Sequence, residues 1–150
     1  MPELKTSQNL SAPADAVWTL LEDFGAIERW WPQDAPIQIQ SVTIDGSGLG
    51  MVRRILNRGA SHPIDERLEF LDRDERRLVL SIVGQRPKGL TGYLAEGQVV
   101  DLGDGRCRMD YRVLFTTDPG LEERTRRGLI ATYAMMFRGL EAAAGPGRNG

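Results

Sequence analysis

The sequence predicts an α+β fold in which a seven-stranded, strongly bent antiparallel sheet wraps around one long C-terminal helix. Six alternating apolar segments follow one another as hairpins between residues 37 and 116. An amphipathic segment at 119–144 closes the chain and is the only predicted element large enough to cover the sheet. The 150 residues fit one domain, expected over 1–144, followed by a disordered tail at 145–150.

The N-terminal part of the chain predicts one strand and two short helices. Residues 3–10 alternate in polarity and predict the first strand. Pro13 and Asp15 then mark a helix start, and apolar residues continue at helical spacing until Gly25. A second short helix is expected over 27–31.

Turn signals rich in glycine and aspartate separate the six later strands. Strands joined by such short turns pair as consecutive hairpins, which predicts an antiparallel meander. The expected pairs are 37–44 with 49–57, 63–71 with 77–83, and 91–101 with 105–116.

The C-terminal segment at 119–144 has apolar residues at helical spacing, which predicts one apolar face toward the sheet and a charged face toward solvent. Arg126, Arg127, Arg138 and Glu141 are assigned to the solvent side. The predicted apolar face contains Leu129, Tyr133, Met136 and Leu140, and it is widened by Ile130, Ala134 and Phe137.

Strand alternation places one carboxylate on an apolar face. In residues 64–70, Glu66 shares its side of the strand with Ile64, Leu68 and Phe70, whereas the intervening residues are charged. A buried charge is costly unless it is paired or neutralised. Glu66 is therefore predicted to face the interior, and the alternatives are a solvated position at the sheet rim or a purely structural ion pair.

The neighbouring strand offers a partner for this carboxylate. Arg53 and Arg54 lie on opposite faces, so one of them is expected to point inward. That arginine either pairs with Glu66 or anchors an anionic group of a ligand. The same alternation predicts an interior wall of Leu80, Ile82, Tyr93, Ala95, Gly97, Val99, Cys107, Met109, Tyr111, Val113 and Phe115.

Composition excludes several classes of function. The net charge of −2 provides no broad basic field, so no nucleic-acid partner is expected. One cysteine, Cys107, and one histidine, His62, exclude a cysteine- or histidine-rich metal site. We expect no metal or cofactor, because no nucleotide or zinc motif is present. Without an apolar leader or a membrane span, a cytoplasmic location is expected.

Trp30 and Trp31 concentrate aromatic surface before Pro32. They indicate either packing of the short helix on the sheet, the mouth of a pocket, or a partner surface. A homodimer through such an exposed patch is one expectation.

Three segments carry a resemblance to a known family. They read APADAVW at 12–18, GLGMVRR at 48–54 and ERLEFLD at 66–72. In their order and spacing the chain resembles the START/Bet v 1-like (SRPBCC) superfamily, and within it the polyketide cyclase/dehydrase-like proteins. This resemblance implies a helix-grip fold with a pocket between sheet and helix.

The stretch from Glu66 to Tyr93 also resembles the plant abscisic-acid receptors, a branch of the same superfamily. That resemblance implies that both residues face the pocket and that the inward arginine is Arg53. The loops at 58–63 and 87–90 take the places of the receptors' gate and latch but differ from them in sequence. The resemblance to the receptors also implies that four further positions line the pocket, those of Leu80, Ile82, Ala95 and Val113.

The function expected first is the binding of a small, hydrophobic or amphipathic molecule in an internal cavity. The second is an enzyme resembling polyketide cyclases, with Glu66 as general acid or base and Tyr93 or Tyr111 donating a hydrogen bond. The third is a protein-interaction module without a ligand. The candidate ligand-binding residues are Arg53, Ile55, Glu66, Leu68, Leu80, Ile82, Tyr93, Ala95, Tyr111, Val113, Leu129, Tyr133 and Met136.

Overall fold

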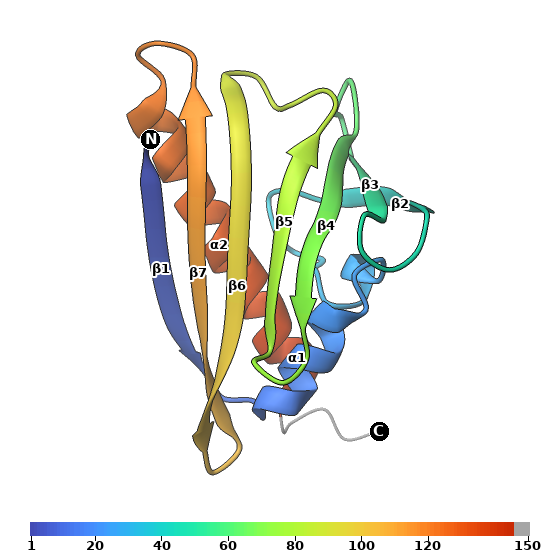
Figure 1. The fold of residues 1–150 in the computed structure, drawn as a ribbon, viewed down its shortest axis with the longest axis vertical. Helices are drawn as coiled ribbons and strands as arrows, with labels where there is room; N and C mark the ends of the chain where they lie inside the picture. The colour runs from blue at the N-terminus through green and yellow to red at the C-terminus, as the bar shows by residue number, and fades with distance from the viewer. Residues whose placement is uncertain (146–150) are drawn as a thin grey trace.

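The computed structural model describes residues 1–145, and the predicted α+β fold is confirmed there (Figure 1). Apart from Gly145, the tail expected to be disordered lies outside the described residues. The elements are β1 (Glu3–Leu10), α1 (Ala14–Glu22), the 3-10 helix η1 (Ile27–Arg29), β2 (Ile39–Asp45), β3 (Val52–Asn57), β4 (Ile64–Asp72), β5 (Arg77–Val83), β6 (Leu90–Gly103), β7 (Arg106–Thr117) and α2 (Glu122–Ala144).

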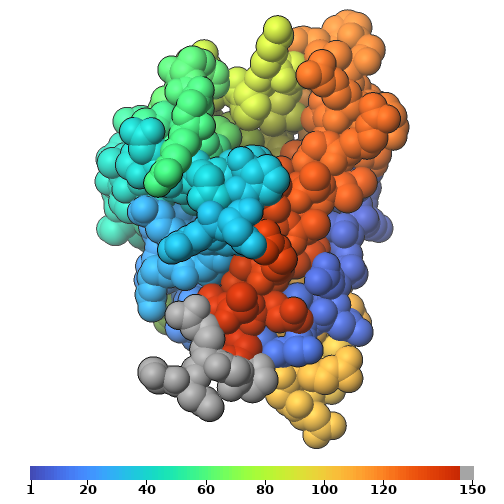
Figure 2. Space-filling model, turned by 180° about the vertical axis from the view of Figure 1, so that it is seen from behind, coloured from blue at the N-terminus to red at the C-terminus, as the bar shows by residue number. Residues whose placement is uncertain are grey.

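The seven strands form one antiparallel sheet in the order β1-β7-β6-β5-β4-β3-β2. Six strands run as the predicted meander, and the first strand returns to pair with the last. The helix α2 crosses one face of this sheet, where it lies between β1 and the 30–38 segment (Figures 1 and 2). The apolar faces of helix and sheet thus bury each other, as the two-layer rule requires.

Alternation along β7 correctly predicts the core. Its inward residues from Cys107 to Phe115 are 0–6% exposed, whereas Arg108, Asp110 and Arg112 face outward and make ion pairs at the surface. Burial raises the pKa of the Cys107 thiol, which disfavours the reactive thiolate. The lone cysteine is therefore a packed core residue, as predicted.

The helices near the N-terminus are shorter than predicted. The helix α1 ends at Glu22 rather than near Gly25, and the second helix is one 3-10 turn. Gly25 serves a packing role instead, because a Cβ atom there would lie 2.6 Å from the Cδ1 atom of Ile44. The chain therefore leaves the helix early enough to pass close to β2.

A bulge in β4 overturns the predicted inward position of Phe70. Leu68 pairs with Leu80 but Phe70 pairs with Val79, so Glu69 is an extra residue on this strand. The extra residue reverses the alternation beyond it. Phe70 is consequently 38% exposed on the outer face.

The apolar face of α2 is narrower than predicted. Ile130 is 46% exposed and Ala134 is exposed as well, so neither widens the buried face. Arg126, which we expected on the solvent side, instead turns toward the sheet, where it donates to the Glu3 carbonyl oxygen at 2.8 Å. The buried side chains of the helix are Tyr133, Met136, Phe137 and Leu140, as predicted.

The two neighbouring tryptophans do not form an exposed patch. Trp30 is 5% exposed, and the half-buried Trp31 donates its indole N–H to the Ile37 carbonyl oxygen at 2.8 Å. The backbone of this segment approaches α2 so closely that a Cβ atom on Gly139 would lie 2.1 Å from the Trp30 carbonyl oxygen. Trp30 therefore adds little exposed aromatic surface, and the homodimer expected through this segment stays a prediction.

Candidate ligand-binding pocket

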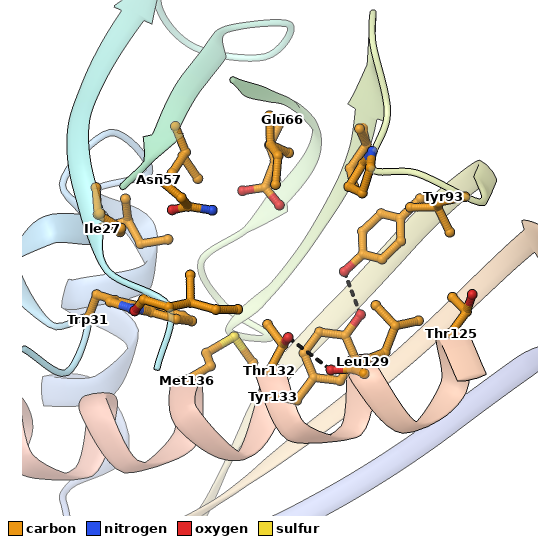
Figure 3. Close-up of a pocket in the computed structure, with 18 of the residues that line it drawn as sticks. Ile27, Trp31, Asn57, Glu66, Tyr93, Thr125, Leu129, Thr132, Tyr133 and Met136 are labelled. Carbon is orange, nitrogen blue, oxygen red and sulfur yellow. Dashed lines mark hydrogen bonds between the residues drawn. The ribbon is translucent and has the colours of Figure 1, made fainter. Parts of the chain in front are cut away.

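A pocket of about 660 Å³ lies between α2 and the sheet, and its wall combines strand, helix and loop residues (Figure 3). Volumes of this size are typical of sites for small organic molecules. Its wall is mostly apolar, with contributions from Ile55, Ile64 and Ile82 on the strands and from Leu129 and Met136 on α2.

An ion pair between β3 and β4 forms one polar part of the wall. Arg53 and Glu66 are direct cross-strand neighbours, and Nε of the arginine donates to Oε1 of the carboxylate at 2.8 Å. The Arg53 Nη1 group donates to the Phe24 carbonyl oxygen at 2.9 Å, and the guanidinium lies 4.0 Å from the centre of the Phe24 ring. Arg53 is 8% exposed, so this cation is held by the carboxylate, the backbone and the ring together.

The other arginine of β3 lies on the opposite face of the strand, as alternation requires. Arg54 faces solvent and makes two hydrogen bonds with Asp65, at 2.9 and 3.1 Å. Its side chain is 55% exposed. The inward arginine is thus Arg53, as the receptor resemblance implied.

Glu66 retains hydrogen-bonding capacity toward the pocket. Its side chain is 15% exposed and points between the sheet and α2 (Figure 3). Among residues 1–145, Arg53 is the one hydrogen-bond partner of its carboxylate. A carboxylate has about four acceptor positions, so several of those on Glu66 face the cavity.

All three tyrosines of the chain converge on the same pocket. The hydroxyl groups of Tyr93 and Tyr133 are 2.6 Å apart, and the ring centres of Tyr111 and Tyr133 are 4.6 Å apart (Figure 3). Gly97, the cross-strand neighbour of Tyr111, makes room for this ring, because a Cβ atom there would lie 3.1 Å from it. The space beside this glycine is thus filled by an aromatic side chain.

Burial raises the pKa of each of these three phenols, that of Tyr93 well above its usual value. Neighbouring tyrosines and the charge of Glu66 raise the pKa values of Tyr93 and Tyr133 further, because a phenolate would face other negative groups. The cluster therefore consists of neutral hydroxyl groups that donate and accept hydrogen bonds.

This cluster predicts an unusual alkaline titration. In the unfolded chain phenols ionise near pH 10, whereas in the folded protein all three pKa values are raised. The unfolded state loses its protons first, so the free energy of unfolding should fall as the pH rises above about 10. Absorbance of tyrosinate should appear only together with loss of the native circular dichroism, and ionisation of any tyrosine in the folded protein would contradict this placement.

Nine of the thirteen predicted residues lie on the pocket wall, and four do not. The four form one continuous row across neighbouring strands, in which each is the cross-strand partner of the next. They are 0–3% exposed and belong to the packed core. The wall contains Arg53, Ile55, Glu66, Ile82, Tyr93, Tyr111, Leu129, Tyr133 and Met136, and the core row contains Leu68, Leu80, Ala95 and Val113.

Several wall residues were not predicted from the sequence. Thr125 and Thr132 follow Leu121 at helical spacing, but polar residues were not assigned to the inward face of α2. Asn57 ends β3 and faces the cavity (Figure 3). Extending the inward face of the helix to polar residues at the same spacing would have identified Thr125 and Thr132. The position of Asn57 at the end of a strand gives no comparable signal.

The predicted mouth is only partly formed by the expected loops. Pro87 and Lys88 line the pocket, as do Trp30 and Trp31. The loop at 58–63 lies at the same end of the strands as the β5–β6 connection (Figure 1). His62 in this loop is not part of the pocket wall. The geometry therefore assigns this histidine no place at the site.

Within residues 1–145, no group of three or more metal-ligating side chains is assembled. No helix in the same range is long and apolar enough to cross a membrane.

Comparison with known proteins identifies the family and the fold. Residues 1–145 match the family model described as polyketide cyclase / dehydrase and lipid transport. No curated protein sequence gives a significant match.

Three solved structures illustrate the likeness in fold. The protein XoxI from Bacillus cereus is 25% identical with a TM-score of 0.81, covering 96% of each chain. Norcoclaurine synthase from Thalictrum flavum, solved with dopamine and hydroxybenzaldehyde, is 19% identical with a TM-score of 0.74, covering 94% of this chain and 84% of that one. The di-domain ARO/CYC protein BexL of the BE-7585A biosynthetic pathway is 19% identical with a TM-score of 0.78, covering 95% of this chain and 46% of that one. On the match over residues 1–145, the chain belongs to the polyketide cyclase/dehydrase and lipid transport family.

Proposed function

We propose that this protein binds a small, largely apolar molecule in the pocket between α2 and the sheet. The observation that carries the proposal is a polar cluster, formed by Arg53, Glu66 and the three tyrosines, on an otherwise apolar wall. Apolar cavities with a few convergent polar groups are typical of small-molecule sites. The apolar wall provides affinity, and the cluster fixes the orientation of the ligand.

The hydrogen-bonding groups define what the ligand carries at its inner end. Glu66 accepts hydrogen bonds, and its pairing with Arg53 holds it in place without using all its acceptor positions. The neutral phenols of Tyr93 and Tyr133 share one hydrogen bond, so one of the two hydroxyl protons is available to a ligand. A hydroxyl group on the ligand fits the carboxylate, and a carbonyl group fits the phenol.

The family also includes enzymes, and one feature of the pocket favours an enzymatic alternative. The phenols line the same pocket as Glu66, and raised pKa values keep them protonated. In such an enzyme Glu66 would abstract a proton from an aromatic or polyketide-like substrate, and Tyr93 would donate a hydrogen bond to the oxygen on which charge develops. Turnover that Glu66→Gln abolishes would favour this alternative over simple binding.

A titration with 2-naphthol, an apolar body with one hydroxyl group, tests the binding proposal. We expect Glu66→Gln to weaken binding roughly ten- to 150-fold, because a hydrogen bond to a charged group contributes roughly 1.5–3 kcal/mol. The matched control is Asp65→Asn, which removes the same charge from the adjacent residue on the outer face. Fluorescence of the probe measures both affinities, and mass spectrometry of a denatured extract identifies any molecule that co-purifies.

Two results would contradict the proposal. The first is a wild-type protein that does not bind 2-naphthol. The second is a Glu66→Gln protein with a lower melting temperature but unchanged affinity, because this would make the carboxylate a structural ion-pair partner only.

A further inference from the structure

The charged residues on the pocket wall are not balanced. Three basic side chains, Arg53, Lys88 and Arg124, line the cavity, against one carboxylate, Glu66. The charge of Arg53 is neutralised by Glu66, and its guanidinium also donates to the Phe24 carbonyl oxygen and lies over the Phe24 ring. The excess positive charge therefore belongs to Lys88 and Arg124, both exposed.

Neither of these two cations has an acidic partner in the part of the chain that the structure describes. No carboxylate oxygen there lies within ion-pair distance of Lys88 or Arg124. The nearby acid Glu122 pairs with Arg126 at 3.5 Å instead. Two unpaired cations that line one cavity create a local positive potential at its entrance.

The fold brings the two cations to one corner of the mouth. Lys88 is in the β5–β6 connection, and Arg124 is in the first turn of α2. These segments are fastened together, because the Asp118 N–H donates to the Gly89 carbonyl oxygen at 2.9 Å. Leu121 packs against the same glycine, where a Cβ atom would lie 2.9 Å from its Cδ1 atom.

We infer that the ligand of this pocket is an amphipathic anion, with its acidic group at the mouth between Lys88 and Arg124 and its apolar body inside. This inference rests on the proposed binding function and adds the charge and the direction of the ligand. The inner polar cluster does not accept the anion, because Arg53 is already neutralised and the Glu66 carboxylate would repel it. The acidic group stays hydrated at the entrance, which avoids the cost of burying a charge.

Two fluorescent probes with the same type of apolar body test the inference. 8-Anilinonaphthalene-1-sulfonate is an anion, and N-phenyl-1-naphthylamine is its uncharged counterpart. We expect Lys88→Gln/Arg124→Gln to weaken binding of the anionic probe about three- to tenfold, the size expected for two exposed charge contacts. Binding of the uncharged probe should change less than about twofold, and added salt should weaken binding of the anionic probe alone.

The matched control is Arg86→Gln/Arg127→Gln. It removes the same charge from the same loop and the same helix at positions that do not line the pocket. This control should leave both probes unaffected. Equal losses in the two double variants, or losses that are equal for both probes, would overturn the anion site and leave the binding function standing. Failure of both probes to bind the wild-type protein would overturn the binding function, and the inference with it.

Discussion

Replacing Arg53 with methionine is expected to lower the free energy of unfolding by about 3 kcal/mol. The variant removes the cation opposite Glu66, leaving a mostly buried carboxylate with neither its charge partner nor its hydrogen bond. It also removes the hydrogen bond to the Phe24 carbonyl oxygen and the contact with the Phe24 ring, which tie the end of α1 to the sheet. The midpoint of urea unfolding, compared at constant slope, measures the effect.

Arg54→Met is the matched control, because it makes the same change one residue later on the outer face. Its partner Asp65 and its own side chain are accessible to water, so we expect a loss below about 1 kcal/mol. In the double variant Arg53→Met/Glu66→Leu, much of the lost stability should return, because no unpaired charge is left in the interior. Equal effects at the two arginines would show that the inner pair does not anchor the sheet to α1.

Most of the sheet could be predicted because alternation and turns report directly on strands. The bounds of β5 agree with the prediction, and alternation along β7 places every inward residue correctly. The errors have local causes. Phe70 is on the outer face because a bulge adds Glu69, and a bulge leaves the sequence pattern of its own strand almost unchanged. Ile130 is exposed because tertiary contacts, rather than hydropathy, set the width of a helix face that is buried.

The sequence could predict which residues face the interior, but not which of them line the cavity and which belong to the packed core. Alternation places Glu66, Tyr93 and Tyr111 on the inner face of the sheet. Helical spacing places Tyr133 opposite them on α2, and the receptor resemblance selects Arg53 over Arg54. The structure brings these residues together in one pocket. Alternation cannot distinguish a cavity wall from a packed core on that same face. Ala95 and Val113 share the inner face with Tyr93, yet they lie in the core row, because the parity of a strand does not report how closely α2 packs against each residue.

Gly128→Trp is expected to weaken ligand binding while leaving the fold intact. Gly128 lies on the pocket-lining stripe of α2 between Thr125 and Thr132, and a Cβ atom there meets no atom within 4 Å. A tryptophan side chain therefore has room to enter the mouth without displacing the core. Its helix propensity is better than that of glycine by about 0.5 kcal/mol, so stability should not fall.

Titration of N-phenyl-1-naphthylamine into the wild-type protein, Gly128→Trp and Ala131→Trp tests the central claim most directly. Ala131 is three residues further along α2, is exposed and does not line the pocket, so the same side chain there should leave affinity unchanged. A ligand that must displace the tryptophan at position 128 meets a packing penalty of about 1–3 kcal/mol, which corresponds to a loss of affinity of roughly five- to 150-fold. We expect this loss in Gly128→Trp alone, with all three proteins folded. Equal affinities in all three proteins would show that the probe binds elsewhere and would contradict a binding site between α2 and the sheet.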